Sequence, residues 1–352
     1  MQTVLVLFGG VSPEHAVSLV SAEAVLRNMN KENRKILPVG ITAEGKWILF
    51  GGGDYSLIAQ DKWEDHPDNC PAFLSPERGM GLCILRNGRT ETVPVDVIFP
   101  VLHGENGEDG SVQGLFRLAG IPFVGCGVCA SAASMDKSVT KLIAATTGVR
   151  QAQWLTLRRS SFRKHADAMC AKITETLGFP VFIKPCGTGS SVGVSKVKTE
   201  SELMPALESA FQYDSKILAE EFINGIEVEV AVLGNESPEA ATAGEIDAGA
   251  EFYDYETKYV TSTSKAYIPA RISDSTMQEI RRSAVKIFCA LGCAGLSRVD
   301  FFVTRDTNEI VFNEINTLPG FTPISMYPKM WAADGLPFPD LIDRLIALAL
   351  ED

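Results

Sequence analysis

GLSRVDFFV (residues 295–303) and EIVFNEI (residues 309–315) are predicted to be two β-strands, because each is a short apolar run that carries a few polar side chains. Side chains alternate between the two faces of a strand, so residues two apart share a face. The pairs concerned are Arg298 with Asp300 and Glu314 with Asn316. If the strands pair, two carboxylates and an amide oxygen meet, and these hard ligands suit Mg²⁺ rather than zinc. A solvated polar face is the alternative for either pair alone.

The sequence around these strands indicates a mixed α/β chain in three parts. From Glu227 onward the strands are longer and alternate, as in an antiparallel sheet, and Phe338–Leu350 has the pattern of an amphipathic helix. In the middle part the predicted elements are helices Lys137–Thr147, Phe162–Leu177 and Glu202–Tyr213 and strands Val181–Lys184 and Lys216–Phe222. In the first part they are strands Val4–Phe8, Val97–Leu102 and Gly120–Gly125, helices Ser18–Met29 and Ser111–Ala119, and a hairpin near Met80–Thr92 within the otherwise irregular stretch Lys46–Arg89.

The composition is that of an ordinary globular protein. The 352 residues include 45% hydrophobic and 22% charged residues, which excludes a disordered chain. The formal net charge of −12 and the pI of about 5.0 argue against a nucleic-acid-binding surface, which needs clustered Lys and Arg. No uncharged apolar run reaches the length of a membrane span, and the N-terminus lacks a basic signal-peptide region. We therefore expect a cytoplasmic protein with no membrane and no nucleic-acid partner.

Eight cysteines are present, and we expect them to be reduced thiols. Cys126 and Cys129 have the spacing of half a zinc site, while Cys289 and Cys293 lie four apart in a helical pattern. Neither pair has a histidine nearby, and free cysteine commonly behaves as a small buried apolar residue. The sequence therefore favours buried thiols over a zinc site.

Three further polar stretches could take part in ligand binding. Lys184 precedes the Gly/Ser-rich stretch Cys186–Val194, whose backbone N–H groups can approach phosphate oxygens, although a plain hairpin tip would look the same. The acidic run Glu220–Glu227 could hold an adenine and a ribose, or it could be a plain edge strand. The loop His103–Gly110 follows a buried strand, where α/β sheets bind ligands, and His103 could equally be a hydrogen-bonded loop residue.

Together these parts resemble the ATP-grasp superfamily and, within it, the D-alanine–D-alanine ligases of bacterial cell-wall synthesis. The resemblance runs in order over almost the whole chain. It rests on residues 9–19, 103–110, 135–137, 184–193, 220–227, 253–259, 297–300 and 313–325. It implies an α/β chain, α+β in its C-terminal part, with a Rossmann-like domain over residues 1–136 and two ATP-grasp lobes over 137–223 and 224–352.

The resemblance also implies which residues bind ATP and metal. Those at the nucleotide are Lys137, Lys184 and Ser191 at the phosphates, Glu220, Glu221, Phe222 and Ile223 around adenine, and Glu227 at the ribose. Asp300, Glu314 and Asn316 would bind two Mg²⁺ ions, for which Mn²⁺ can substitute. The family further suggests a homodimer.

The amino-acid substrates have their own set of residues in this resemblance. Glu14 would hold the ammonium of the first D-alanine, and Ser190 and Tyr259 would link to it as the loop at residues 251–266 closes over the site. The remaining residues are Arg298 and the backbone N–H of Gly320 at the oxyanion, Lys258, Ser325 and Met326 at the second substrate, and His103 in the catalytic set.

The implied reaction is ATP-dependent formation of D-alanyl-D-alanine through an acyl phosphate. Met326 offers an apolar wall that suits a methyl group, which favours D-alanine over D-serine as the second substrate. A D-alanine–D-serine ligase is the alternative within the family, and a biotin-carboxylase-like enzyme is a more distant rival. A sensor that binds ATP without turnover is the rival from another class, although it would have no need of the Asp300, Glu314 and Asn316 set.

Overall fold

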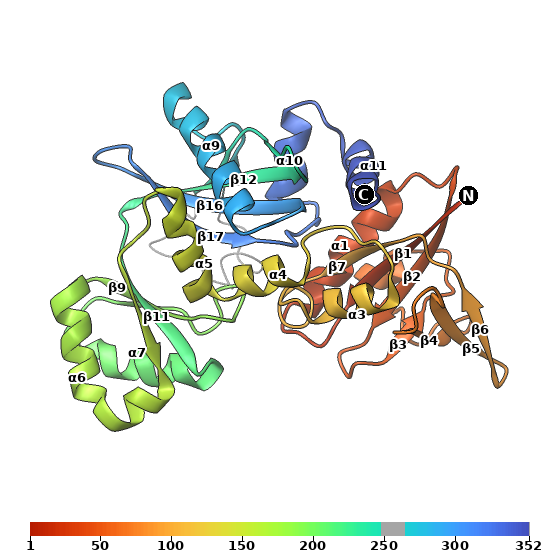
Figure 1. Ribbon diagram of the computed structural model, residues 1–352, viewed down its shortest axis with the longest axis horizontal. Helices are drawn as coiled ribbons and strands as arrows, with labels where there is room; N and C mark the ends of the chain where they lie inside the picture. Colours follow the sequence, from red (N-terminus) through yellow and green to blue (C-terminus); the bar gives the residue numbers. More distant parts are fainter. Residues whose placement is uncertain (248–264, 352) are drawn as a thin grey trace.

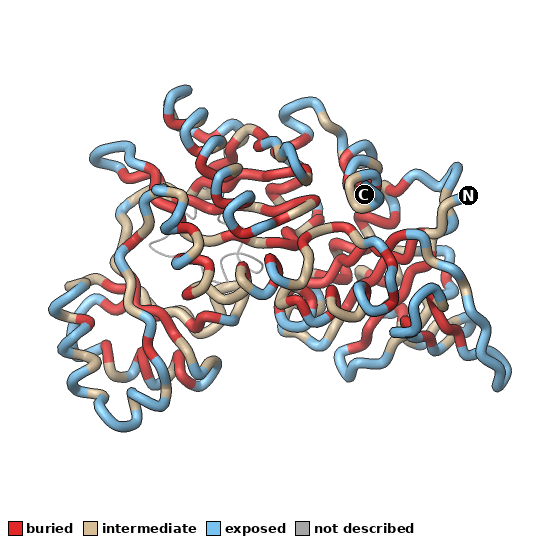
Figure 2. Tube along the Cα trace, in the orientation of Figure 1, coloured by how far each residue is buried: buried red, intermediate tan, exposed pale blue. Residues whose placement is uncertain are grey.

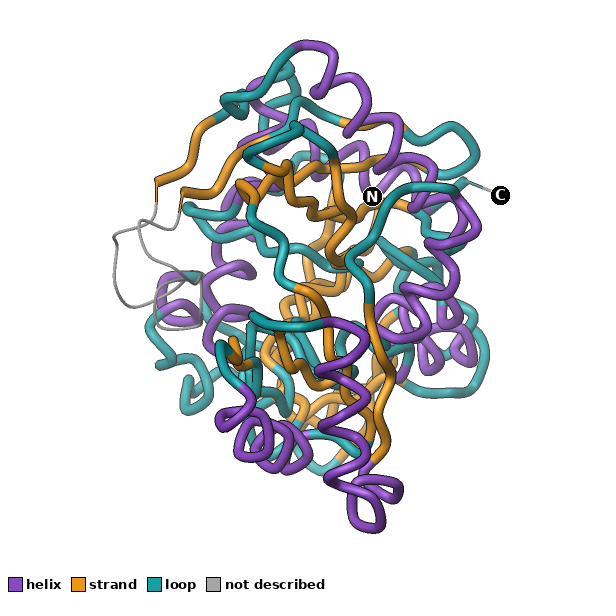
Figure 3. The backbone as a smooth tube through the Cα atoms, turned by 90° about the vertical axis from the view of Figure 1, so that its left-hand side faces the viewer, coloured by secondary structure: helices purple, strands orange, loops and turns teal. Residues whose placement is uncertain are grey.

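The computed structural model describes residues 1–247 and 265–351, which form three sheets with helices packed around them (Figure 1). The strands run through the middle of the molecule, and most helices lie on its outside (Figure 3). Buried positions are concentrated along the strands (Figure 2). In the described part of the chain, no helix is long and apolar enough to cross a membrane.

The first sheet has seven strands in the order β6-β5-β4-β3-β2-β1-β7. Its parallel centre consists of β2 (Arg34–Ile41), β1 (Gln2–Gly9) and β7 (Val97–Leu102). Its antiparallel extension consists of β3 (Trp47–Leu49), β4 (Cys70–Leu74), β5 (Leu82–Arg86) and β6 (Arg89–Val93). β1 is apolar on both faces because each face is covered. Val4, Val6 and Phe8 share a core with α1 (His15–Asn28), and Leu5 and Leu7 share one with α3 (Ser111–Ala119).

The second sheet has four antiparallel strands in the order β10-β9-β11-β8. The strands are β8 (Trp154–Arg158), β9 (Val181–Pro185), β10 (Ser195–Val197) and β11 (Lys216–Glu221). Helices α6 (Arg159–Leu177) and α7 (Glu200–Tyr213) pack on this sheet through Ile173, Leu203 and Leu207, and they lie at the lower left of Figure 1. The other face of the sheet is left to line the cavity described below.

The third sheet is antiparallel, in the order β15-β14-β12-β16-β17, with β13 paired to β12. Its strands are β12 (Gly225–Gly234), β13 (Glu239–Ala240), β14 (Gly244–Asp247), β15 (Lys265–Tyr267), β16 (Gly295–Thr304) and β17 (Ile310–Asn316). Helix α9 (Asp274–Ala290) packs on one face. Helices α10 (Met326–Ala333) and α11 (Phe338–Ala349) pack on the other and join it to the core of the first sheet.

Four short helices complete the described chain: α2 (Ser56–Ala59), α4 (Val128–Met135), α5 (Lys137–Ala144) and the 3₁₀ helix η1 (Ala145–Thr147). The predicted strand over Gly120–Gly125 is wrong, because only an isolated bridge forms there, between Phe123 and Ile98. The stretch at residues 46–89, predicted to be irregular apart from a hairpin, also holds β3, β4 and α2. Segments of three to five residues are too short to show a period.

The three sheets occupy residues 2–102, 154–221 and 225–316. Domain boundaries at 136 and 223 stay a prediction. Of the cysteines, Cys293 lies beyond the end of α9, so it is not part of the expected helical pair with Cys289. Cys126 is buried and its thiol donates to the carbonyl oxygen of Ala294 at 3.5 Å.

Candidate active site

A cavity of about 1470 Å³ lies between the three sheets. Its wall includes Glu14 and His103 from the first part of the chain, Lys184 from the second, and Arg298 and Glu314 from the third. Glu14 and His103 follow the ends of β1 and β7, and ligands of α/β sheets bind at the carboxyl ends of strands. The cavity therefore collects polar side chains that are far apart in the sequence.

The β16–β17 pair forms one wall of this cavity. Its register places Asp300 opposite Glu314 and Arg298 opposite Asn316, so the four side chains share a face. Asp300 is only 1% exposed, and it accepts a hydrogen bond from Asn316 Nδ2 at 3.0 Å. Its two carboxylate oxygens also accept from Nε and Nη2 of Arg298, at 2.8 and 2.7 Å. The pairing expected from the sequence is therefore present.

Arg298 carries a fixed positive charge at this wall. Burial alone would lower the pKa of its guanidinium, but Asp300 and Glu229 raise that pKa well above its usual value. Glu229 lies on the neighbouring strand β12, with Oε1 3.4 Å from Arg298 Nε. A partly buried cation whose orientation is fixed by ion pairs is suited to stabilising negative charge that develops in a transition state.

A buried lysine, Lys141, and a partly buried one, Lys184, share one carboxylate. Glu220 on β11 forms ion pairs with Lys184 on β9, at 2.6 Å, and with Lys141 on α5. Burial would raise the pKa of Glu220, but the two lysines lower it to about 2. Burial would likewise lower the pKa of Lys184, and Glu220 raises it instead. Both side chains stay charged at neutral pH, and a positive ammonium faces the cavity.

The Gly/Ser-rich loop connects the first and second parts of the chain. Ser190 donates a hydrogen bond to Glu14, which brings together two residues predicted to meet. Lys137, at the start of α5, donates to the Thr188 carbonyl oxygen at 2.7 Å and lies 4.0 Å from Glu314. Ser190 and Ser191 have φ of +45° and +60°, a left-handed backbone that costs energy for residues other than glycine. Such strain is typical of loops shaped to hold a ligand.

His103 is held between two parts of the chain. Its Nδ1 donates to the Leu318 carbonyl oxygen at 3.0 Å, and its Nε2 lies 3.2 Å from the hydroxyl of Ser21. Burial lowers the pKa of this imidazole, so the ring is neutral near pH 7. Both ring nitrogens have protein partners, which fits the interpretation of His103 as a hydrogen-bonded loop residue, and its place in the catalytic set stays a prediction.

Glu108 lies in the same loop, and its position in the sequence indicated no role of its own. It accepts from the backbone N–H of Gly104 at 2.8 Å and from that of Leu318 at 3.1 Å. Burial raises the pKa of its carboxyl to about 8, and the nearby Glu14 adds to the rise. Like His103, it attaches the loop to the segment that precedes Gly320. The only feature of the sequence that could have indicated a role for Glu108 is its position in the acidic loop at residues 103–110.

The remaining predicted residues within the described part of the chain line the same cavity. They are Ser191, Glu221, Phe222, Ile223, Glu227, Gly320, Ser325 and Met326. Ser325 accepts from the Thr322 N–H at 3.0 Å, which orders the turn after Gly320. Met326 is 5% exposed, with its methyl group packed against Gly244. Lys258 and Tyr259 lie outside the described residues.

Two family models match the chain, "D-ala D-ala ligase N-terminus" over residues 3–126 and "D-ala D-ala ligase C-terminus" over residues 143–347. The chain belongs to the D-alanine–D-alanine ligase family. It is 46% identical over 349 residues to the D-alanine–D-alanine ligase of Caldicellulosiruptor bescii, covering 99% of this chain and 95% of that protein. It is 48% identical over 359 residues to that of Acetivibrio thermocellus, covering 99% and 96%.

Solved structures of this ligase family share the fold. The VanG D-Ala:D-Ser ligase from Enterococcus faecalis has a TM-score of 0.90 at 42% identity, with 99% of each chain covered. The D-alanine–D-alanine ligase from Coxiella burnetii has a TM-score of 0.86 at 34% identity, with 99% of this chain and 93% of that chain covered. These neighbours establish the ATP-grasp architecture expected from the sequence, and the family uses ATP and a divalent metal ion.

The ligand atoms that Asp300, Glu314 and Asn316 offer are of the kind that such a metal ion binds. Asp300 and Glu314 supply carboxylate oxygens from paired positions on β16 and β17. Asn316 directs its amide nitrogen to Asp300, which leaves its amide oxygen as the ligand atom. All three donors are hard oxygens, the class preferred by Mg²⁺ and Mn²⁺.

Proposed function

We propose that this protein is an ATP-dependent ligase that joins two molecules of D-alanine and releases ADP and phosphate. The proposal rests on one observation, namely that three sets of polar side chains with different chemistry line the same cavity. The contact between Glu14 and Ser190 offers a carboxylate for a substrate ammonium. The Lys184–Glu220–Lys141 group offers cations for phosphates. The β16–β17 wall offers metal ligands and a guanidinium.

ATP is proposed to lie between the second and third sheets. Lys137, Lys184 and Ser191 would contact its phosphates, since their side chains gather around the Gly/Ser-rich loop. The segment at residues 220–223 would hold adenine and Glu227 would hold the ribose. The carboxylate of Glu220 is itself ion-paired to two lysines, which supports a role in keeping those ammonium groups in place.

Two Mg²⁺ ions, or Mn²⁺ in their place, are proposed at Asp300, Glu314 and Asn316. When bound, they would neutralise charge on the transferring phosphoryl group. Arg298 lies beside these ligands and would add a positive charge that needs no rearrangement during the reaction.

The reaction is proposed to begin when the carboxylate of the first D-alanine attacks the γ-phosphorus of ATP and ADP leaves. This gives an acyl phosphate and makes the carbonyl carbon reactive. The amine of the second D-alanine then attacks that carbon, a proton is lost, and phosphate leaves. Arg298 and the backbone N–H of Gly320 would stabilise the tetrahedral oxyanion, at about 3–4 kcal/mol for each donor. Exclusion of water protects the acyl phosphate from hydrolysis.

A D-alanine–D-serine ligase is the second candidate, because the VanG D-Ala:D-Ser ligase is among the structural neighbours. Met326 favours D-alanine over D-serine. It lines the cavity as an apolar residue and offers no partner for a serine hydroxyl. An apolar pocket rejects an added hydroxyl by only about 10²-fold, so weak D-serine activity is expected. Negligible D-lactate activity is expected near neutral pH.

Product analysis tests the proposal. The protein is incubated with ATP, Mg²⁺ and D-alanine, alone and in competition with D-serine or D-lactate, and the products are identified by mass spectrometry. D-Alanyl-D-alanine as the main product, with one phosphate released per dipeptide, supports the proposal. Mostly D-alanyl-D-serine would favour the second candidate. ATP binding without phosphate release stimulated by D-alanine would favour the sensor and contradict the ligase.

The product D-alanyl-D-alanine would serve peptidoglycan precursor synthesis, and thereby the cell wall and cell shape. A cytoplasmic location and a homodimer stay predictions. Size-exclusion chromatography with light scattering measures the second of these.

A further inference from the structure

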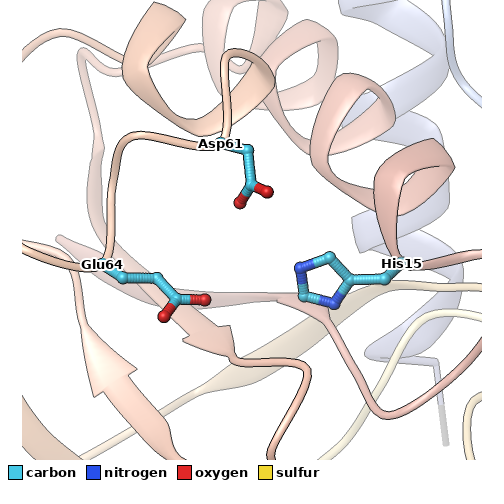
Figure 4. Close-up of side chains that lie close together, drawn as sticks. All are labelled: His15, Asp61 and Glu64. Carbon is cyan, nitrogen blue, oxygen red and sulfur yellow. The ribbon is translucent and has the colours of Figure 1, made fainter.

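Three side chains outside the cavity converge on a common space (Figure 4). His15 is the first residue of α1, and Asp61 and Glu64 lie in the turn that follows α2. One imidazole nitrogen and one oxygen from each carboxylate lie within 4.8 Å of one another. His15 and Glu64 are partly buried and Asp61 is exposed, so the cluster is open to solvent on one side. The proposed reaction uses none of these residues.

The hydrogen bond of His15 fixes which ring nitrogen faces the carboxylates. Its Nδ1 lies 2.8 Å from the carbonyl oxygen of Gly10, and because a carbonyl only accepts, Nδ1 carries the proton. In the neutral ring Nε2 then has the lone pair, and Figure 4 shows the imidazole pointing toward Asp61 and Glu64. Metal-binding histidines commonly donate their other ring nitrogen to a carbonyl or carboxylate in this way.

The local charge also favours a cation. The Glu64 carboxylate is repelled by those of Glu44, Asp61 and Asp65. Carboxylates that repel one another in this way are stabilised when a divalent ion binds among them.

We propose that His15, Asp61 and Glu64 bind a divalent transition-metal ion of the zinc class at a site separate from the cavity. One imidazole nitrogen and two carboxylate oxygens form a donor set that suits Zn²⁺ or Co²⁺ better than Mg²⁺, which prefers oxygen alone. Tetrahedral bonds of about 2.0–2.2 Å place ligand atoms about 3.4 Å apart, so atoms that lie within 4.8 Å of one another close in by at most about 1.4 Å on binding. Water completes the coordination.

We expect the proposed metal site to affect substrate binding, because one of its ligands is adjacent in the sequence to a residue proposed to bind substrate. Glu14 directly precedes His15 and accepts from Ser190. An ion that holds His15 to the turn after α2 also holds the loop that presents Glu14, which lowers the KM for the first D-alanine. This second statement rests on the proposed function, whereas ion binding itself does not.

Cobalt titration of the untagged, chelator-treated full-length protein tests the site. Millimolar Mg²⁺ is present to fill the carboxylates of the cavity, and the visible d–d absorption of Co²⁺ is recorded. The expected result is one Co²⁺ per chain, displaced by Zn²⁺, without the near-ultraviolet band of cobalt bound to thiolate. Asp61→Asn and Glu64→Gln should each weaken binding by more than about tenfold, since loss of partners outside the ligand shell already costs 10–100-fold.

Asp65→Asn is the matched control, because it removes the same charge from the same turn without removing a ligand. Thermal unfolding of each variant verifies that it is folded. Binding that survives in both Asp61→Asn and Glu64→Gln overturns the site, as does equal loss in Asp65→Asn or a thiolate band. A KM for D-alanine that Zn²⁺ does not change refutes the link to Glu14 alone. Absence of ligase activity refutes the proposed function, and the cobalt titration still decides the site.

Discussion

Replacing Glu220 by Gln would leave Lys141 and Lys184 without the carboxylate they share at a buried position. The structure sets the size of the effect. The pKa of this carboxyl falls from its ordinary 4.5 to about 2 in the folded chain, in spite of burial, because the two ammonium groups lower it. Since one pH unit corresponds to about 1.4 kcal/mol, the ionised carboxylate contributes about 3 kcal/mol to stability. Removal of one partner from a buried ion pair typically costs about 3–5 kcal/mol, which agrees.

The sign of the pH dependence follows from the lowered pKa. The contribution of Glu220 is fully present above pH 4.5, where the carboxyl is ionised in the unfolded chain too, and it is lost as the pH falls through about 2. At pH 7 the Glu220→Gln variant therefore loses the whole contribution. Below about pH 2 its stability approaches that of the wild-type protein.

Native-state hydrogen exchange with mass spectrometry reads this effect locally, which suits a chain with three sheets. Amides of β9 and β11 should exchange about 100-fold faster in Glu220→Gln than in the wild-type protein, the equivalent of about 3 kcal/mol. Glu221→Gln is the matched control, one residue further along β11, with a half-buried side chain. Lys141→Met should cost less than Glu220→Gln, because it leaves one balanced pair. An increase below tenfold in Glu220→Gln, or one equal to that of the control, would refute the reasoning.

Other variants test the proposed chemistry. Asp300→Asn and Glu314→Gln should each abolish turnover while the chain stays folded, although Asp300→Asn also lowers the melting temperature because Asp300 is buried and paired with Arg298. Near-normal rates at saturating Mg²⁺ would contradict a metal role. Arg298→Ala should lower kcat by about 10²–10³ and raise KM less, since its interaction strengthens in the transition state, whereas a change in KM alone would mean simple binding. Ser190→Ala should raise the KM for the first D-alanine, measured by phosphate release, and an unchanged KM would count against the loop contact. Met326→Arg should shift the product ratio toward D-alanyl-D-serine, with Met326→Leu as the control that keeps D-alanine preferred.

The sequence predicted most of the long elements because their patterns are local. The buried strand Val97–Leu102 and the helix Ser111–Ala119 have the predicted bounds. Alternation along each strand predicted that Arg298 shares a face with Asp300 and Glu314 with Asn316. The register that places Asp300 opposite Glu314, with a shift between Asp300 and Phe301, comes from the pairing of the two strands. Helix α9 was missed although it spans 17 residues, and β2 was missed as well.

No local sequence pattern predicted which polar side chains would pair with one another across the cavity. Lys141 sits on a helix that the sequence predicted, yet nothing in the local pattern shows that it reaches Glu220 on another element. The same holds for Glu108, whose raised pKa comes from burial and from Glu14, almost a hundred positions away. Met326 was expected to face a substrate, and the structure adds that its methyl group packs against Gly244.

The sequence by itself determined the class of fold, the order of the motifs and the types of side chain available for the chemistry, because these depend on period and on residue identity. Only the tertiary structure decided which charges meet. It paired Glu220 with two lysines, fastened His103 between Ser21 and Leu318, and turned His15 toward Asp61 and Glu64. The physical reason is that ion pairs and pKa values depend on distance and burial in space. Those quantities are fixed only when elements far apart in the chain have packed together.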